Sequence, residues 1–448
     1  MMHWAVVGGG FRGIVTAILL RQRGCAVTLI EKAAHLGGLL YSGDWEGLYI
    51  DRGAHLFDNV DDHITQMMHD ILGQEIVPVD VRYAAVMADR KVDGLAVPDF
   101  TSLSEETKRR ALFELMNAVA APEGPAAVTL KDVYDQRFGK TLSDLLDGPT
   151  RKMLRAEPRD LAPESFISTP FQRLRFLDDS VTEILKKSPD LDDVIALPVK
   201  NDPLRHYKNS VSLYPHRNYY PLKKGMRQFC EQAADYLRKI GVDLRIETGL
   251  SGIAKHDGKL TLDFGGEALA CDRLLWASPV GGLAGLLWGE NPLMGWATPV
   301  PMLMYYYLVP QDRVGPYAYM HDFSEQHLLF RPSAIGRYGG QNREDGMTYV
   351  CLEVVTDRDS AEWNDPDAFA ERVWQEAADL GVVEGPCPET RMVHAMPVTY
   401  VPPKPGFTQR RDALMTRLQQ EFDGRVHALE QHAFSKTDIQ EAIELWMQ

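Results

Sequence analysis

The chain has 448 residues, of which 45% are apolar and 25% charged, so it can bury a sizeable core and predicts about two or three folded units. A formal net charge of −15 argues against nonspecific nucleic-acid binding, which needs a basic face. Five cysteines with no C-x-x-C pair fit a reducing compartment and give no metal site. The first predicted strand begins at residue 3, so we expect no signal peptide, and the uncharged run 274–289 is too short and too rich in glycine to span a membrane. We therefore expect a cytoplasmic protein.

The N-terminal segment carries the pattern G-x-G-x-x-G between a predicted strand over 3–7 and a predicted helix over 14–20. The first glycine, Gly8, permits a tight turn, Gly10 lets the backbone approach a pyrophosphate, and Gly13 lets the helix pack on the strand. The helix N-terminus offers N–H groups and a positive dipole end to phosphates. A second strand over 26–30 ends in Glu31, which is placed to bind a ribose. This order predicts a dinucleotide-binding site.

Two further segments follow this site in the chain. The pair Gly37-Gly38 allows the backbone to run against a flat ligand, and His55, between apolar residues, is a candidate to face a ring. Taken alone, both segments are better explained as a loop and a strand with a satisfied histidine.

Taken together, these segments resemble the superfamily of flavin-containing amine oxidases, protoporphyrinogen oxidases and UDP-galactopyranose mutases. Its members continue from the glycine loop to an acid, a glycine pair and then G-x-H-x-F, which stands here as Gly53-x-His55-x-Phe57. The resemblance implies FAD as the cofactor and an α/β fold, with a discontinuous Rossmann-type FAD-binding domain, a helical insertion and an antiparallel-sheet substrate domain. It implies that the cofactor-binding residues are Gly8, Gly10, Phe11, Arg12, Gly13, Glu31, Lys32, Gly37, Gly38, Leu39, His55, Leu250, Asp438 and Ile439.

The same resemblance divides the chain into domains. The FAD-binding domain is expected over 1–75, 205–290 and 396–448, the helical substrate domain over 76–204, and the antiparallel-sheet domain over 291–395. The pattern departs near the C-terminus, where Glu430 and Gln431 stand in place of the usual Gly-Arg or Gly-Asp. Glu430 would bring a carboxylate near a ribityl or pyrophosphate group, which puts one of the expected FAD contacts in question.

Three residues are the candidates for contact with the reacting centre. In relatives the histidine of G-x-H-x-F lies close to the flavin ring, so the resemblance places His55 there. Arg331 and Tyr338 are predicted at strand ends and are candidate substrate contacts. A basic stretch over 200–224 is either an anion-binding lip for a phosphorylated substrate or the cofactor, or a solvated loop.

The predicted function is that of an FAD-dependent oxidoreductase acting by hydride transfer to flavin N5. Its partner would be a small molecule, a sugar nucleotide or another polar biosynthetic intermediate. Three alternatives stay open: a redox-neutral mutase acting on a nucleotide sugar, a non-catalytic nucleotide-binding scaffold, and a plain NAD-dependent dehydrogenase.

Overall fold

The structure is a computed structural model that describes residues 1–59, 62–79, 82–88, 90–121, 124–198, 216, 218–340, 342–429 and 446. The chain divides into two compact units. Unit 1 comprises Met1–Val79, Ser210–Met294 and Thr408–Gln448, and unit 2 comprises Asp80–Asn209 and Gly295–Phe407. Glu430, Gln431, Asp438, Ile439 and most of the basic stretch lie outside the described residues.

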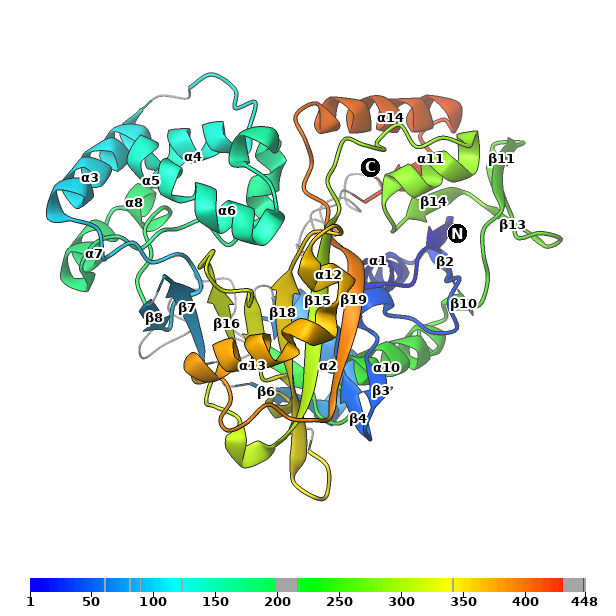
Figure 1. Cartoon of the computed structure of the whole chain (residues 1–448). Coiled ribbons are helices and arrows are strands. Elements are labelled where there is room, and N and C mark those ends of the chain that lie inside the picture. Colours follow the sequence, from blue (N-terminus) through cyan, green and yellow to red (C-terminus); the bar gives the residue numbers. More distant parts are fainter. Residues whose placement is uncertain are drawn as a thin grey trace. The chain divides into compact units, whose positions relative to one another are not determined.

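Unit 1 is built on a parallel five-stranded sheet with the strand order β10-β2-β1-β14-β20. Its strands are β1 (His3–Val7), β2 (Ala26–Ile30), β10 (Asp243–Arg245), β14 (Arg273–Trp276) and β20 (Val426–Ala428). Helices α1 (Phe11–Gln22), α10 (Met226–Lys239), α11 (Val280–Trp288) and α14 (Phe407–Glu421) accompany them (Figure 1). The strand order reverses between β1 and β14, and in open α/β sheets ligands bind beyond the carboxyl ends of the strands at such a point.

Helix α1 is buried almost all round, with eight consecutive buried residues from Gly13 to Leu20. Its sequence is apolar on every face because it lies against the sheet and other elements of unit 1, including α10. Thr16 is the one hydroxyl in this buried run, and it donates a hydrogen bond to the carbonyl of Arg12 at 2.7 Å. The buried helix fixes the direction in which its N-terminus points.

The remaining elements of unit 1 form small sheets around this core. A three-stranded antiparallel sheet contains β11 (Gly252–His256), β12 (Lys259–Asp263) and β13 (Ala268–Cys271). A second small sheet pairs β9 (Asn218–Pro221) with β5 (Phe57–Asp58) and β6 (Ile76–Pro78), and helix α2 (Asp62–Leu72) packs on it. The hairpin β3 (Gly43–Trp45) and β4 (Leu48–Ile50) completes unit 1.

Unit 2 combines a seven-stranded sheet with a group of helices (Figure 1). The strand order is β19-β15-β18-β17-β16-β7-β8. The strands are β7 (Tyr83–Met87), β8 (Arg90–Asp93), β15 (Val300–Pro310), β16 (Tyr319–Asp322), β17 (Arg331–Ser333), β18 (Met347–Val355) and β19 (Arg391–Tyr400). The helices are α3 (Glu105–Ala120), α4 (Leu130–Phe138), α5 (Lys140–Leu145), α6 (Asp147–Leu154), α7 (Asp179–Leu185), α8 (Pro189–Asp192), α12 (Ala361–Asn364) and α13 (Ala370–Asp379).

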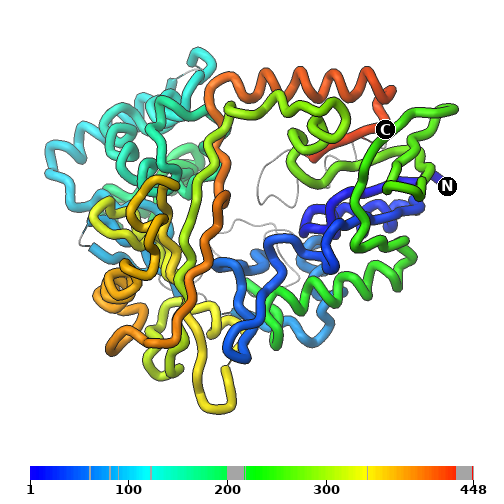
Figure 2. Tube along the Cα trace, turned by 45° about the vertical axis from the view of Figure 1, so that its right-hand side comes forward, coloured from blue at the N-terminus to red at the C-terminus, as the bar shows by residue number. Residues whose placement is uncertain are grey.

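Figure 2 follows β15 and β19 as long neighbouring segments of this sheet. All strand pairs are antiparallel except β7 with β16, which are parallel. Residues 83–87 and 90–93, expected in the helical region, therefore form two strands of the sheet. The pairing joins segments more than 200 residues apart, which local sequence pattern does not reveal.

Two boundaries in unit 2 are set by local sequence. Strand β17 begins at Arg331, and Pro366 opens a 3-10 turn over Pro366–Phe369 that precedes α13. Within the described residues, no helix is long and apolar enough to cross a membrane.

Candidate functional site

The glycine loop joins β1 directly to α1. Gly8 has φ +110°, a conformation that favours glycine, and its N–H donates to the carbonyl of Ile30 at 2.9 Å. A Cβ on Gly13 would lie 1.8 Å from the carbonyl oxygen of Gly8. Only glycine at position 13 therefore allows α1 to begin so close to the end of β1.

Gly10 has a different environment from the other glycines of this loop. It is the N-cap of α1, and a Cβ built on it would meet no atom within 4 Å. The first turn of α1 contains no acidic residue. Open space in front of a helix N-terminus without a nearby carboxylate in that turn fits a pyrophosphate, which the helix dipole would stabilise.

Glu31 lies beside this loop at the end of β2. Its Oε2 accepts a hydrogen bond from the Gly9 N–H at 2.6 Å, and its Oε1 accepts one from the Ala33 N–H at 2.8 Å. The two bonds fix the carboxylate, while each oxygen keeps lone-pair capacity for a further donor. A ribose hydroxyl is such a donor.

The glycine pair packs against the glycine loop. The Gly37 N–H donates to the Gly9 carbonyl at 2.8 Å, and a Cβ on Gly38 would lie 3.7 Å from the Gly10 Cα. Gly37 has φ +106°, and a Cβ there would come within 2.1 Å of Cys230 Sγ on α10. The fold therefore brings the predicted cofactor-binding glycines Gly10, Gly37 and Gly38 together. The buried thiol of Cys230 on α10 packs against Gly37.

Other predicted cofactor residues lie at the edges of this region. Lys32 and Leu39 are exposed, and Leu39 is 57% exposed although it is a large apolar residue. Leu250 lies between β10 and β11 and packs against the core of unit 1. Arg12 is partly buried in the first turn of α1.

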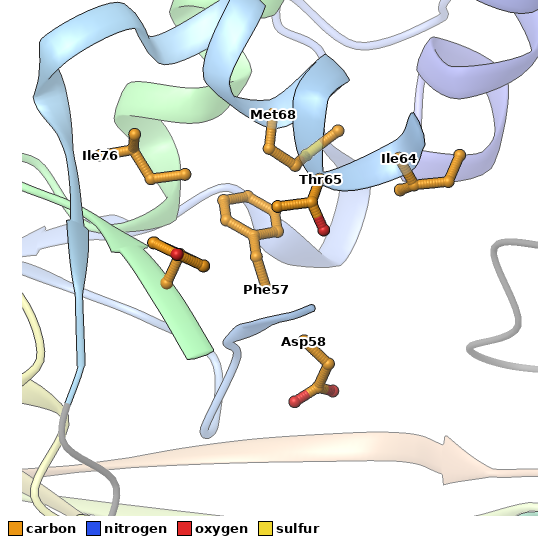
Figure 3. Close-up of a pocket in the computed structure, with 7 residues that line it drawn as sticks. Phe57, Asp58, Ile64, Thr65, Met68 and Ile76 are labelled. Atoms are coloured by element: carbon orange, nitrogen blue, oxygen red, sulfur yellow. The ribbon is translucent and has the colours of Figure 1, made fainter. Parts of the chain in front are cut away.

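Phe57 of the G-x-H-x-F motif is a core residue. Its ring lies 5.0 Å from that of Phe229 and 6.5 Å from that of Phe11, which follows Gly10 in the glycine loop. Figure 3 shows Phe57 pointing towards Thr65 and Met68 of α2, while Asp58 points the opposite way. The aromatic contact couples the motif to the start of α1.

His55 is partly buried in the loop that precedes β5. Its Nε2 lies 3.1 Å from the carbonyl oxygen of Arg52, so the Nε2–H donates to its own loop. This bond assigns the proton to Nε2 and leaves Nδ1 as the acceptor.

Asp51, just before this motif, is a functional candidate that the sequence reasoning missed. It is fully buried and accepts hydrogen bonds from Ser42 Oγ at 2.6 Å, Tyr220 OH at 2.7 Å and the Met226 N–H at 3.2 Å. Desolvation by burial raises its pKa to about 6, although these three donors oppose the shift. The carboxylate ties the His55 loop to the N-terminus of α10. Its position two residues before Gly53 of the G-x-H-x-F motif was the signal that could have identified it.

The other two candidates belong to unit 2, and both have partners within that unit. Tyr338 is buried, and its hydroxyl donates to the Ala318 carbonyl at 3.0 Å. The expectation that it lies at a strand end was wrong, because it follows a 3-10 turn over Ile335–Arg337. Arg331 begins β17, and its Nη2 lies 2.8 Å from Glu353 Oε2. Glu353 was also missed, although a lone acid in the apolar run of β18 signals a buried charge pair.

Two lysines of the basic stretch fall within the described residues, and both are paired. Lys223 Nζ lies 2.6 Å from Glu75 Oε1, and Lys224 Nζ lies 2.9 Å from Glu231 Oε2. Neither is therefore an unpaired cation.

A parallel sheet with a glycine-lined helix N-terminus at its switch point, and an acid at the end of the next strand, defines a dinucleotide-binding protein. The family model of flavin containing amine oxidoreductases matches residues 13–306, which is more than half of the chain. The chain belongs to this family of FAD-dependent oxidoreductases.

Solved structures agree on the fold. A reduced UDP-galactopyranose mutase superposes with a TM-score of 0.66 at 16% identity, covering 95% of this chain and 89% of that one. An Exiguobacterium sp. 255-15 protein assigned as a protoporphyrinogen oxidase superposes with a TM-score of 0.64 at 17% identity, and the match covers 99% of both chains. A putrescine oxidase bound to putrescine superposes with a TM-score of 0.60 at 14% identity, and the match covers 95% of this chain and 92% of that one.

Curated relatives match only a short segment. A 4,4'-diapolycopen-4-al dehydrogenase of Metabacillus indicus is 42% identical over 52 residues, which cover 12% of this chain and 11% of that protein. A Baeyer-Villiger monooxygenase of Streptomyces coelicolor is 43% identical over 54 residues, covering 12% and 9%. The matched part is a small fraction of each relative's length.

Proposed function

We propose that this protein oxidises a small polar substrate by transferring a hydride from it to N5 of FAD. The open space at Gly10, in front of the N-terminus of α1, is the observation that carries the proposal. FAD, when bound, supplies the redox chemistry by accepting the hydride. The chain's part is to bind and orient the cofactor and the substrate.

The described residues suggest how the cofactor would be held. The backbone from Gly10 to Gly13 would bind the pyrophosphate, and Glu31, already fixed by two N–H groups, would accept hydrogen bonds from the ribose. The backbone at Gly37 and Gly38 would allow a close approach. His55, with its proton on Nε2, would contribute a hydrogen bond near the ring.

A pair of glycine variants tests this assignment. Gly10→Val places a branched side chain where the pyrophosphate would lie, and we expect its FAD content after purification to fall at least about tenfold. Gly285→Val is the matched control, because a Cβ there, on α11, also meets no atom within 4 Å. Normal FAD content in folded Gly10→Val, or an equal loss in both variants, would refute the assigned site.

A redox-neutral mutase acting on a nucleotide sugar is the second candidate. The motif Gly53-x-His55-x-Phe57, which resembles that of the mutases, favours it. The two reactions differ in electron balance, because only an oxidoreductase is reduced by its substrate. Loss of the oxidised-flavin absorption on anaerobic addition of a substrate would support oxidation, whereas turnover of a nucleotide sugar only by chemically reduced enzyme would support the mutase.

A further inference from the structure

The seven-stranded sheet of unit 2 has two chemically different faces. One face is apolar and packs on α13, with Tyr307 of β15 and Trp374 of α13 at a ring distance of 5.1 Å. Leu352 and Val354 of β18 belong to the same core. Because successive residues of a strand alternate, Glu353 lies on the other face.

Strand register places a polar row on that second face. Arg331 of β17 is directly opposite Glu353 of β18. Tyr319 of β16 is opposite Ser333 of the antiparallel strand β17. His321, two residues after Tyr319, therefore lies beside Arg331, two residues before Ser333, on this face. We call the four residues His321, Arg331, Ser333 and Glu353 the Arg331 row.

Arg331 and Glu353 form a pair without net charge. The Nε of Arg331 lies 3.0 and 3.1 Å from the two carboxylate oxygens, and Nη2 lies 2.8 Å from Oε2. Glu353 is 0% exposed, whereas the side chain of Arg331 is 21% exposed. Among the described residues, Nη1 of Arg331 has no hydrogen-bond partner. The guanidinium therefore retains donors, but its charge is compensated.

His321 presents an acceptor next to this donor. Its Nδ1 lies 3.2 Å from the carbonyl oxygen of Ala96, which assigns the proton to Nδ1 and leaves a lone pair on Nε2. Burial, and secondly the charge of Arg331, lower the pKa of His321 to about 4, so the ring is uncharged near neutral pH. No described residue donates to Nε2.

Ser333 adds a second unsatisfied group to the same face. It is 0% exposed, and its Oγ is a buried polar atom without a partner in the described part of the chain. Buried hydroxyls are normally bonded, so an orphan two residues from Arg331 points to a missing partner at this place.

We propose that the Arg331 row is a binding site within unit 2 for the uncharged hydroxyl group of a small molecule, which accepts a hydrogen bond from Arg331 and donates one to His321 Nε2. A hydroxyl both accepts and donates through a single oxygen atom. A carboxylate or phosphate would gain little from a guanidinium that Glu353 already neutralises, and an ammonium would meet the donors of Arg331. Glu353 is a positioning residue that holds the guanidinium and cancels its charge. The class of ligand is therefore a neutral alcohol, and this assignment does not depend on the cofactor site of unit 1.

Three probes of one shape test the proposal: benzyl alcohol, benzoate and benzylamine, titrated into the FAD-loaded protein at about pH 7 and followed by ligand-observed NMR. The wild type is expected to bind benzyl alcohol at least about tenfold more tightly than either charged probe. Glu353→Gln keeps the side-chain shape but exposes the charge of Arg331. Benzoate affinity should then rise about tenfold, while that for benzyl alcohol changes little.

Asp99→Asn is the matched control for loss of a buried carboxylate. Asp99 is 1% exposed and pairs with Arg175 at 3.0 Å elsewhere in unit 2, so this variant should leave the probe preference unchanged. Benzoate binding as tight as benzyl alcohol in the wild type, or an unchanged preference in folded Glu353→Gln, would overturn the proposal. If Glu353→Gln does not fold, His321→Phe provides the second test, because it must abolish the preference for the alcohol. Probe binding needs no flavin reduction, so failure of the proposed oxidation is recognised separately by the visible spectrum.

Discussion

Asp51 shows how one buried side chain organises the segment beside the glycine pair. Its carboxylate accepts the Met226 N–H, and Ser42, which donates to it, accepts the Arg227 N–H at 2.9 Å. The first turn of α10 is thus capped by residues from another part of unit 1, since its own N-cap is Gly225. The cost is a carboxylate removed from water.

The burial of the Asp51 carboxylate predicts that the stability of the protein depends on pH. The pKa of Asp51 is raised from 3.8 to about 6, so the folded state binds the proton more tightly than the unfolded state. The stability that this group provides is fully present below about pH 4 and is lost as the pH rises through about 6. Between about pH 4 and 6, we expect the free energy of unfolding of the wild type to fall by roughly 2 to 3 kcal/mol relative to that of Asp51→Asn. Urea unfolding at several pH values measures this difference. Parallel pH profiles for the two proteins would contradict this.

At the scale of the element, the start of α1 depends on two glycines for different reasons. Gly13 is needed because a Cβ would collide with the backbone of Gly8, whereas Gly10 faces open space. Gly13→Ala should destabilise the flavin-free protein by roughly 1 to 3 kcal/mol, and Gly10→Ala should stay within about 1 kcal/mol of wild type. Denaturant unfolding of both variants provides the measurement. Equal stabilities would mean that α1 does not pack on β1 in this way.

Helix α6 provides a second prediction, because it carries a buried lysine. Lys152 lines a cavity of about 550 Å³ within unit 2 and donates to the carbonyl of His327. Burial lowers the pKa of Lys152 from 10.5 to about 8. Between these pH values the unfolded state therefore binds the proton more tightly than the folded state does. Between about pH 8 and 10.5, the free energy of unfolding of the wild type should rise by roughly 3 kcal/mol relative to that of Lys152→Met. Urea unfolding of both proteins across this range measures the difference. A difference between the two proteins that is constant across this range would be the contrary result.

In the molecule as a whole, the residues proposed to hold the cofactor lie in unit 1, although the chain leaves and re-enters that unit. Binding of FAD should therefore slow amide exchange in peptides covering 8–13 and 31–38, while peptides covering 105–154 of unit 2 exchange as before. Hydrogen exchange of flavin-free and reloaded protein measures this. Protection confined to unit 2 would contradict the assignment.

The sequence signals for the N-terminal half of the proposed cofactor site are local. Gly8, Gly10, Gly13 and Glu31 lie within one strand–helix–strand unit, where glycine spacing and an apolar helix determine the geometry. The structure brings these residues together as the pattern indicates.

Contacts between distant segments were not predictable in the same way. Glu353 lies 22 residues from Arg331, and the ring of Phe229 reaches the glycine loop from a part of the chain more than 200 residues away. Such contacts depend on strand register and helix packing, which composition and periodicity do not specify. The same limit explains why residues 83–87 and 90–93 were not recognised as strands of the large sheet.

The visible absorption spectrum of the purified protein, followed by heat release and identification of the cofactor, shows whether the protein binds FAD. We expect a yellow protein that releases FAD. A colourless protein that also fails to bind added FAD would contradict the cofactor site at Gly10 and Glu31.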